Sequence, residues 1–153
     1  MKVKVYLGSD HGGFELKNLI KDWLESEGYE VVDKGAMDEE VEDDLVDYAE
    51  LMAQELQQDI EARGILFCRN GVGMSMAANR YMGVRCALGF DVGQVERART
   101  DDDVNCLSVP ADYLKMETVK EMVEAFLKTE FSGKERYKRR LSKLAVVGGA
   151  VCE

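Results

Sequence analysis

Short apolar runs alternate along this chain with longer segments in which apolar side chains recur every three or four residues. The short runs have the length and composition of strands, whereas the longer segments have the period of amphipathic helices. The predicted strands span residues 3–7, 29–32, 65–68, 84–88 and 105–109. The predicted helices span residues 14–27, 45–62, 74–80, 94–99 and 116–127. Strands that alternate with helices predict an α/β fold around a parallel sheet of five strands.

The length of the chain and its connections indicate a single domain, residues 1–153, that can bury a sizeable core. The acidic stretch at residues 37–44 carries a run of like charges, so we interpret it as a solvated loop. Pro110 follows the last predicted strand, where a residue without an amide hydrogen disturbs the sheet least. The small apolar segment from Ala145 onward either frays or docks on a partner subunit.

Composition and charge exclude several classes of function. The net charge of −10 opposes binding to nucleic acid through the overall field of the protein. No apolar run approaches the ~20 residues of a membrane-spanning helix, and the chain opens on a strand pattern rather than a signal peptide, so we expect a cytoplasmic protein. The four cysteines, Cys68, Cys86, Cys106 and Cys152, are widely spaced and the chain has one histidine, so we expect no disulfide, no metal site and no cofactor.

Two glycine-rich turns each follow a predicted strand and precede a helical segment. The first, at residues 8–13, reads GSDHGG, and the second, at residues 68–73, reads CRNGVG. Ligands of an open α/β sheet bind outside the carboxyl ends of its strands, so both turns are candidates to line a site. Successive amides and a following helix N-terminus suit a phosphate or an oxyanion. The alternative is a plain turn that needs glycine for its backbone angles.

Cys68 is the candidate reactive group, because it stands at the first position of the second turn. There its thiol would face a nest of backbone amides, which favours the thiolate and lowers the pKa from its usual value of about 8.5. A thiolate at this place is a candidate base or nucleophile. Hydrolysis would require a histidine partner, for which His11 is the one candidate, whereas proton abstraction requires none. The alternative for Cys68 is a packing role at the end of a buried strand.

A basic stretch at residues 133–144 contrasts with the acidic remainder of the chain. Its cations are Lys134, Arg136, Lys138, Arg139, Arg140 and Lys143. Arg136 and Arg140 are four residues apart, so they share one face if the stretch is helical. Two guanidinium groups on one face suit a phosphate. A solvated helix face or a basic tail is the alternative interpretation.

These motifs resemble a known family, ribose-5-phosphate isomerase B, to which the galactose-6-phosphate isomerase subunits are related. The similarity rests on GSDHGGFELK at residues 8–17, on GILFC at residues 64–68 and on GVGMSMAANR at residues 71–80. It continues to about residue 144 and includes Gly83, Val84, Arg85, Arg99, Asn105 and the arginine-rich end. The resemblance implies a Rossmann-like three-layer sandwich and a homodimer or tetramer with active sites at the subunit interface.

The resemblance also implies a reaction, the metal-free isomerisation of a phosphorylated aldose to a ketose through an enediolate, with ribose 5-phosphate as the first candidate substrate. Cys68 would be the base that moves a proton between C1 and C2. The enediolate would be held by the amides of Arg69, Asn70, Gly71, Val72 and Gly73. The sugar hydroxyls would meet Asp10, and the phosphate would be held by His11, Arg136 and Arg140, partly from the neighbouring subunit.

The chain departs from the family pattern at four places. The family usually has His-Asn-Asp before the last strand, with the histidine opening the sugar ring, whereas this chain has Asp101, Asp102 and Asp103. The departures elsewhere are Arg69-Asn70 for Gly-Thr, Leu45-Val46 for Tyr-Pro and Asp112 for an arginine. Adjacent aspartates repel one another, so with some burial Asp101 could become a usable acid or base, with Asp102 beside the substrate. The second hypothesis is a non-catalytic phosphosugar-binding or structural subunit of a hetero-oligomer, and a cysteine-dependent hydrolase is the third.

Overall fold

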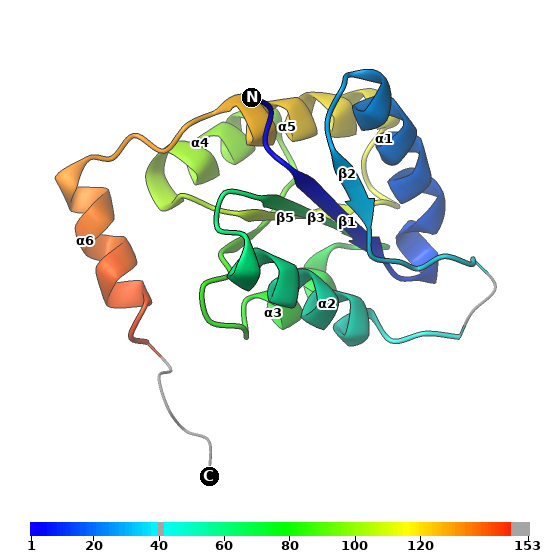
Figure 1. Ribbon diagram of the computed structural model, residues 1–153, viewed down its shortest axis with the longest axis horizontal. Coiled ribbons are helices and arrows are strands. Elements are labelled where there is room, and N and C mark those ends of the chain that lie inside the picture. Colours follow the sequence, from blue (N-terminus) through cyan, green and yellow to red (C-terminus); the bar gives the residue numbers. More distant parts are fainter. Residues whose placement is uncertain (40–41, 148–153) are drawn as a thin grey trace, which may run out of the picture.

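A five-stranded parallel sheet forms the centre of the computed structural model, which describes residues 1–39 and 42–147 (Figure 1). The strands are β1 (Val5–Ser9), β2 (Val31–Asp33), β3 (Arg63–Cys68), β4 (Cys86–Leu88) and β5 (Cys106–Pro110). Their order in the sheet is β2-β1-β3-β5-β4, and each neighbouring pair is parallel. The predicted α/β fold with a five-stranded parallel sheet is therefore confirmed.

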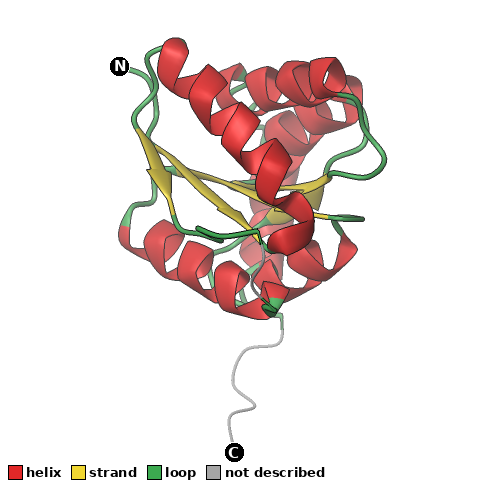
Figure 2. Ribbon diagram, turned by 90° about the vertical axis from the view of Figure 1, so that its right-hand side faces the viewer, coloured by secondary structure: helices red, strands yellow, loops and turns green. Residues whose placement is uncertain are grey.

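Helices cover both faces of the sheet, which makes three layers (Figure 2). One hydrophobic core lies between the sheet and three helices, α1 (Phe14–Ser26), α4 (Val92–Asp102) and α5 (Met116–Lys128). A second core lies between the other face and two helices, α2 (Leu45–Gln58) and α3 (Val72–Ala78). Because both faces are covered, the central strands β1 and β5 are buried along their whole length.

The direction in which the chain adds strands reverses at one point in the sheet. From β1 the chain passes outward to β2, and from β3 it passes outward in the opposite direction. The reversal lies between β1 and β3, and ligands of open α/β sheets bind at this kind of point, outside the carboxyl ends of the strands. A short 3₁₀ helix, η1 (His11–Gly13), follows β1, and the second glycine-rich turn follows β3. Both predicted turns therefore lie beside the reversal.

Two helices differ in length from the prediction, for local reasons. Helix α2 ends at Gln58 rather than near residue 62, because Asp59 has an extended backbone and its carboxylate accepts the amide of Glu61 at 3.2 Å. Helix α4 begins at Val92, because the carboxylate of Asp91 caps it by accepting the amide of Gln94 at 3.1 Å. It also continues to Asp102, so the aspartates before β5 lie at its carboxyl end.

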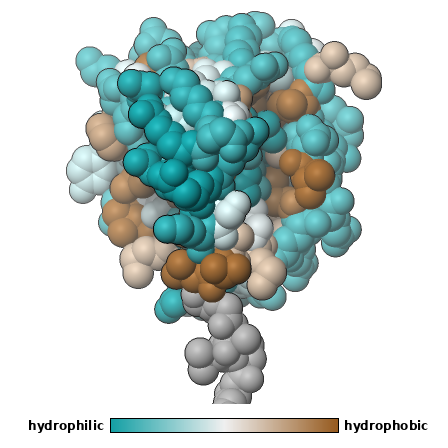
Figure 3. All heavy atoms as spheres, turned by 90° about the vertical axis from the view of Figure 1, so that its left-hand side faces the viewer, coloured by the Kyte–Doolittle hydropathy of each residue, from teal (hydrophilic) through white to brown (hydrophobic). Residues whose placement is uncertain are grey.

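A last helix, α6 (Glu135–Leu144), stands apart from the three layers (Figure 1). The segment before it is tied to α4 where the amide of Ser132 donates to the carbonyl of Thr100 at 3.0 Å. Figure 3 looks onto α6 and shows hydrophilic atoms over the helix, with apolar atoms beside its carboxyl end. The exposed apolar side chains there are Leu144, Val146 and Val147.

The predicted fraying or docking of the C-terminal segment falls mostly on residues 148–153, which lie outside the described residues, as does Cys152. Among the described helices, none has the length and apolar character needed to cross a membrane.

Candidate active site

The turn after β1 is folded tightly against β3. The Asp10 carboxylate accepts the amide of Gly13 at 3.2 Å and so caps the short helix η1. Gly13 is needed because a Cβ at this residue would come within 2.5 Å of the Phe67 backbone. Asp10 is 8% exposed, and this burial raises the pKa of its carboxyl group although the amide of Gly13 acts in the opposite direction. The turn therefore brings a largely buried carboxyl group beside the end of β3.

His11 is held by a residue that the sequence did not single out. Its Nδ1 lies 2.7 Å from the Asp43 carboxylate, and its backbone amide donates to the same oxygen at 3.3 Å. The other Asp43 oxygen accepts the Tyr48 hydroxyl at 3.0 Å. The prediction that residues 37–44 form only a solvated loop is therefore wrong for Asp43, whose side chain is 6% exposed.

These contacts shift three pKa values. The hydrogen bond to Asp43 is the main cause of a raised pKa at His11, which favours the imidazolium ion. Burial alone would favour neutral Asp43, but the hydrogen bonds from His11 and Tyr48 outweigh it and hold the pKa of Asp43 below its usual value. Burial and the bond to Asp43 raise the pKa of Tyr48 to about 12, so its hydroxyl stays a donor.

Cys68 ends β3 with its thiol against the second turn. The amide of Gly71 donates to Sγ at 3.2 Å, and Gly71 has the positive φ of 73° that this geometry requires. The Gly71 carbonyl in turn accepts the buried hydroxyl of Ser108 on β5 at 2.6 Å. The predicted contact between Cys68 and a nest of amides is therefore confirmed.

The predicted lowering of the Cys68 pKa by these amides is wrong. The residue is 3% exposed, and burial raises the pKa of its thiol more than the amides of Met74, Gly71 and Asn70 lower it. The nearby negative charge of Asp10 acts in the same direction as burial. The resting form of Cys68 at neutral pH is accordingly the thiol.

Two side chains of the second turn contact the turns around Cys68. The Asn70 carboxamide oxygen accepts the amide of Val72 at 3.0 Å, so it lies where an oxyanion would bind. Arg69 is 3.4 Å from Asp112, and its aliphatic stem packs against Gly12, where a Cβ would come within 2.5 Å of it. Both partners of this ion pair are largely exposed, with side-chain exposures of 65% and 47%. The guanidinium group thus lies above the first turn, close enough to act electrostatically on His11.

The remaining predicted residues gather around α6 and the end of α4. The guanidinium groups of Arg136 and Arg140 lie 4.5 and 5.6 Å from the centre of the Tyr137 ring, so they share one side of α6, as predicted. Arg140 also acts electrostatically on Asp102. Burial and the charge of Asp101 raise the pKa of Asp102. The sequence favoured Asp101 as the acid or base, and the raised pKa of Asp102 makes this carboxyl group a second candidate.

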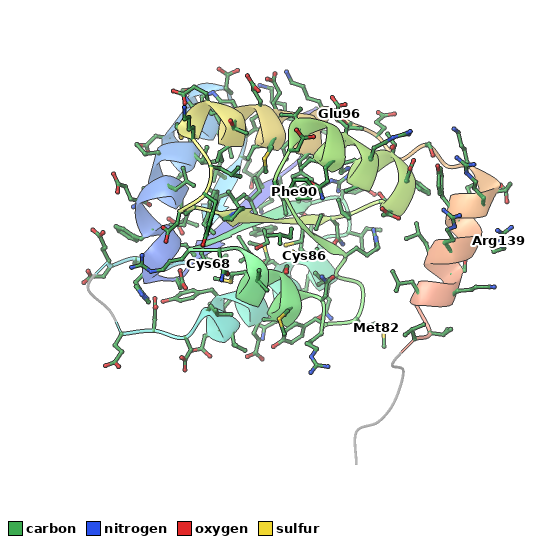
Figure 4. The ribbon with its side chains drawn as sticks, turned by 180° about the vertical axis from the view of Figure 1, so that it is seen from behind. Cys68, Met82, Cys86, Phe90, Glu96 and Arg139 are labelled. Carbon is green, nitrogen blue, oxygen red and sulfur yellow. The ribbon has the colours of Figure 1, made fainter. Side chains whose placement is uncertain are left out.

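The two groups of residues lie at opposite ends of the strands, which we call the carboxyl edge and the amino edge of the sheet. Cys68 is the last residue of β3, at the carboxyl edge, whereas Asp101 and Asp102 precede β5 at the amino edge. The five residues of β5 span about 16 Å, which separates the two edges. Figure 4 shows the same separation, with Cys68 at one side of the molecule and Arg139, on α6, at the other. The basic helix of a chain is therefore not near the Cys68 turn of that chain.

The amino edge also carries structural ion pairs and a cavity. Asp103 contacts both Arg85 at 3.0 Å and the buried Arg99 at 2.9 Å, so it joins α4 to the residue before β4. A cavity of about 550 Å³ lies beside this cluster, lined partly by Arg63, Arg99 and Asp103, and not by Cys68. Within the described residues, no three histidine, cysteine or carboxylate side chains are grouped so that they could hold a metal ion.

Asp43 and Tyr48 are the site residues that the sequence did not reveal. Asp43 stands in a run of acidic residues and Tyr48 in a helical pattern, so neither position is distinctive. Their contact with His11 depends on how the segment before α2 folds over the first turn. Only the glycine-rich turn itself, which fixes where His11 lies, was visible in the sequence.

Comparison with known proteins shows that this chain is similar in sequence and structure to sugar-phosphate isomerases. Residues 5–144 match the family described as ribose/galactose isomerase. The probable ribose-5-phosphate isomerase B of Mycoplasma pneumoniae is 38% identical over 144 residues, covering 94% of each chain. A ribose 5-phosphate isomerase from Thermotoga maritima, a crystal structure, has 39% identity and a TM-score of 0.90 over 94% of this chain and 97% of its own. The isomerase B of Mycoplasma genitalium, solved with bound ribulose-5-phosphate, has 33% identity and a TM-score of 0.91 over 96% and 97%.

Proposed function

The chain belongs to the ribose/galactose isomerase family, and on that premise we propose that it is a sugar-phosphate isomerase that interconverts ribose 5-phosphate and ribulose 5-phosphate. The contact between the Cys68 thiol and the amide of Gly71 is the observation that carries this proposal. It puts a proton acceptor beside donors that can receive negative charge, which is what enediolate chemistry requires.

In the proposed reaction, Cys68 acts as a thiolate and removes the proton from C2 of the open-chain aldose. The electron pair of the broken C–H bond forms the C1–C2 double bond, and the carbonyl oxygen on C1 becomes negatively charged. A proton passes from the O2 hydroxyl to O1, and return of the abstracted proton to C1 then gives the ketose and regenerates the thiolate, so no oxidant or reductant is consumed. The amides from Arg69 to Gly73 would stabilise the oxyanion, which requires the Asn70 oxygen to leave the amide of Val72.

We assign opening of the sugar ring to the carboxyl groups at the end of α4. Asp101 stands where the family usually has a histidine. Ring opening needs one proton taken from the O1 hydroxyl and one given to the ring oxygen. Asp101 would accept the first, and Asp102, whose raised pKa favours the protonated acid, is suited to supply the second.

The position of these groups favours an active site shared between two copies of the chain. Cys68 and Asp101 lie at opposite edges of one sheet, so both can reach one sugar only if they come from different chains. Two-fold symmetry would then build two equivalent sites, each with one carboxyl edge and one α6. In each site, His11 and Arg69 from one chain would face Arg136 and Arg140 from the other, around the phosphate. Asp10 would meet the sugar hydroxyls.

Exposed apolar side chains support this assembly. Val72, Met76, Met82 and Phe90 are 42% to 76% exposed, and they lie around α3 and the edge strand β4. Figure 4 shows Met82, Cys86 and Phe90 between Cys68 and α6. A surface of this kind between two half-sites suits contact with another copy. We further propose that the enzyme acts in the cytoplasm, where Cys68, Cys86 and Cys106, all free thiols, would stay reduced.

The proposal is tested by incubating the protein with ribose 5-phosphate in deuterated water and following ribulose 5-phosphate formation, with deuterium incorporation at C1 of the product and at C2 of the recovered substrate. We expect both, and we expect the Cys68→Ala variant to lose at least a hundredfold in kcat, as is typical when a general base is removed. Full activity of that variant would remove Cys68 as the base. Binding of the sugar phosphate to the unaltered chain without any turnover would favour the non-catalytic hypothesis instead.

A further inference from the structure

The Asp43 carboxylate receives three hydrogen bonds from the residues around it. One oxygen accepts both the backbone amide and the ring Nδ1 of His11, at 3.3 and 2.7 Å, and the other accepts the Tyr48 hydroxyl at 3.0 Å. The Asp43 side chain is 6% exposed, whereas that of His11 is 45% exposed. The carboxylate therefore lies behind the imidazole ring, and the ring faces outward.

The elements around Asp43 hold it in place. Tyr48 is on the first turn of α2, and its ring lies so close over Gly35 that a Cβ there would come within 2.9 Å of a ring carbon. The turn at Gly35 is bonded to the end of β1, where the amide of Ser9 donates to the Gly35 carbonyl and the amide of Ala36 donates to the Ser9 carbonyl, both at 2.6 Å. Asp43 is thus fixed relative to the strand that carries the first turn.

The bond to Nδ1 decides how His11 meets a ligand. With Nδ1–H directed at a carboxylate, the ring is oriented and Nε2 is left for the substrate. The other charged groups that act on the ring are Asp10 and Arg69. Of these two, only Arg69, which belongs to the second turn, has an exposed side chain. In a protein with a net charge of −10, a phosphate group needs local positive charge of this kind.

We propose that Asp43 is a positioning residue for phosphate recognition: it orients the His11 imidazole and keeps it protonated, so that Nε2–H donates to the substrate phosphate, and Tyr48 holds Asp43 in place. The inference rests on the proposed function, because it takes the ligand of His11 to be a sugar phosphate. It adds a carboxylate, supplied by the segment before α2, to the residues that determine affinity.

The test uses the fact that His11 is the one histidine in the chain. The ring protons of the untagged protein, followed by NMR as the pH is varied, report the protonation of His11 without any need for activity. We expect the midpoint of the titration to lie at lower pH in Asp43→Asn than in the unaltered chain, because an amide does not favour the imidazolium ion. Glu42→Gln removes a charge from the neighbouring exposed residue and is the matched control, for which we expect an unchanged midpoint.

Kinetics with ribose 5-phosphate give the second readout. We expect Asp43→Asn to raise KM about tenfold with a much smaller change in kcat, which is at the lower end of what loss of a histidine's carboxylate partner does at metal sites. KM should begin to rise at lower pH than in the unaltered chain, because binding is lost as His11 gives up its proton. The substrate phosphate titrates identically in both proteins, so the difference between the two profiles belongs to His11.

Three outcomes would overturn the inference: a His11 midpoint that does not move in Asp43→Asn, an unchanged KM, or the same changes in Glu42→Gln. If Asp43→Asn does not fold, Tyr48→Phe replaces it, and a smaller rise in KM is expected because Asp43 loses one of its donors. If the unaltered chain does not isomerise the sugar phosphate, the proposed function fails. The inference is then tested by NMR alone. Added inorganic phosphate should shift the His11 signals in the unaltered chain and should not shift them in Asp43→Asn.

Discussion

Mixing two inactive variants tests whether the active site is shared between two chains. One variant, Cys68→Ala, destroys the carboxyl-edge half of the site, and the other, Arg136→Ala/Arg140→Ala, destroys the α6 half. The first should lose about 10²- to 10⁴-fold in rate, as for removal of a general base. Hydrogen bonds to charged groups are worth about 1.5–3 kcal/mol each, so loss of both arginines should lower kcat/KM by roughly 10²- to 10⁴-fold.

Because β5 separates the two halves of the site within one chain, the expected recovery depends on how the two variants combine in dimers. If the two variants are expressed together and assemble at random into two-fold dimers, about half of the dimers are mixed, and each mixed dimer has one intact site and one site with both defects. The mixture should therefore recover about one quarter of the unaltered activity per chain. The assay is the initial rate of ribulose 5-phosphate formation at a substrate concentration below the KM of the unaltered chain, where the rate reports kcat/KM, with each variant also measured alone.

The control is a pair of variants that damage the same half, Cys68→Ala and His11→Ala. Each mixed dimer then has a defect in both of its carboxyl-edge halves, so mixing should recover nothing. Absence of recovery in the first pair, although mixed dimers are detected by mass spectrometry, would refute a site shared between chains. Equal recovery in both pairs would show that mixing merely stabilises the protein.

Three further results are expected. In the unaltered chain, kcat should rise with pH up to the raised pKa of Cys68, because the thiolate is the active form and burial keeps the thiol protonated below that pH; a flat profile would exclude this role. Lys17→Met should lower the free energy of unfolding, measured by urea titration, by about 3 kcal/mol, because it removes the buried ammonium group that lies 2.7 Å from the Asp33 carboxylate. An effect below about 1 kcal/mol would contradict this. Arg69→Ala should change the free energy of unfolding by less than about 1 kcal/mol, because its ion pair with Asp112 is exposed, yet it should raise KM for ribose 5-phosphate; an unaltered KM would show that Arg69 does not meet the substrate.

The features that the sequence predicted correctly are those determined by residues that are close together along the chain. The alternation of strands and helices indicated the parallel sheet, and the two glycine-rich turns indicated where Cys68 and His11 lie relative to its carboxyl edge. The geometry around Cys68 followed from one local rule, a strand that ends in a glycine-containing turn. These features depend on residues that are near one another in the sequence.

The features that were missed depend on contacts between distant segments or on the balance of opposing effects. Asp43 meets His11 across 32 residues, and nothing in an acidic run distinguishes the one carboxylate that becomes buried. The pKa of Cys68 is set by burial against hydrogen bonds, and the sequence gives no measure of burial depth. The raised pKa of Asp102 comes from its burial and from the charge of Asp101, and the apolar pattern of this segment did not indicate that burial.

The placement of charge on α6 has a consequence for how two chains meet. The helix carries five cations, at Arg136, Lys138, Arg139, Arg140 and Lys143, against one carboxylate, at Glu135, while the whole chain is strongly acidic. Each chain is therefore an electric dipole with α6 as its positive pole. Such a field turns approaching molecules before they touch, over roughly the 8–10 Å Debye length of physiological salt. The basic helix would thus help select the orientation of the encounter, and added salt would slow the association.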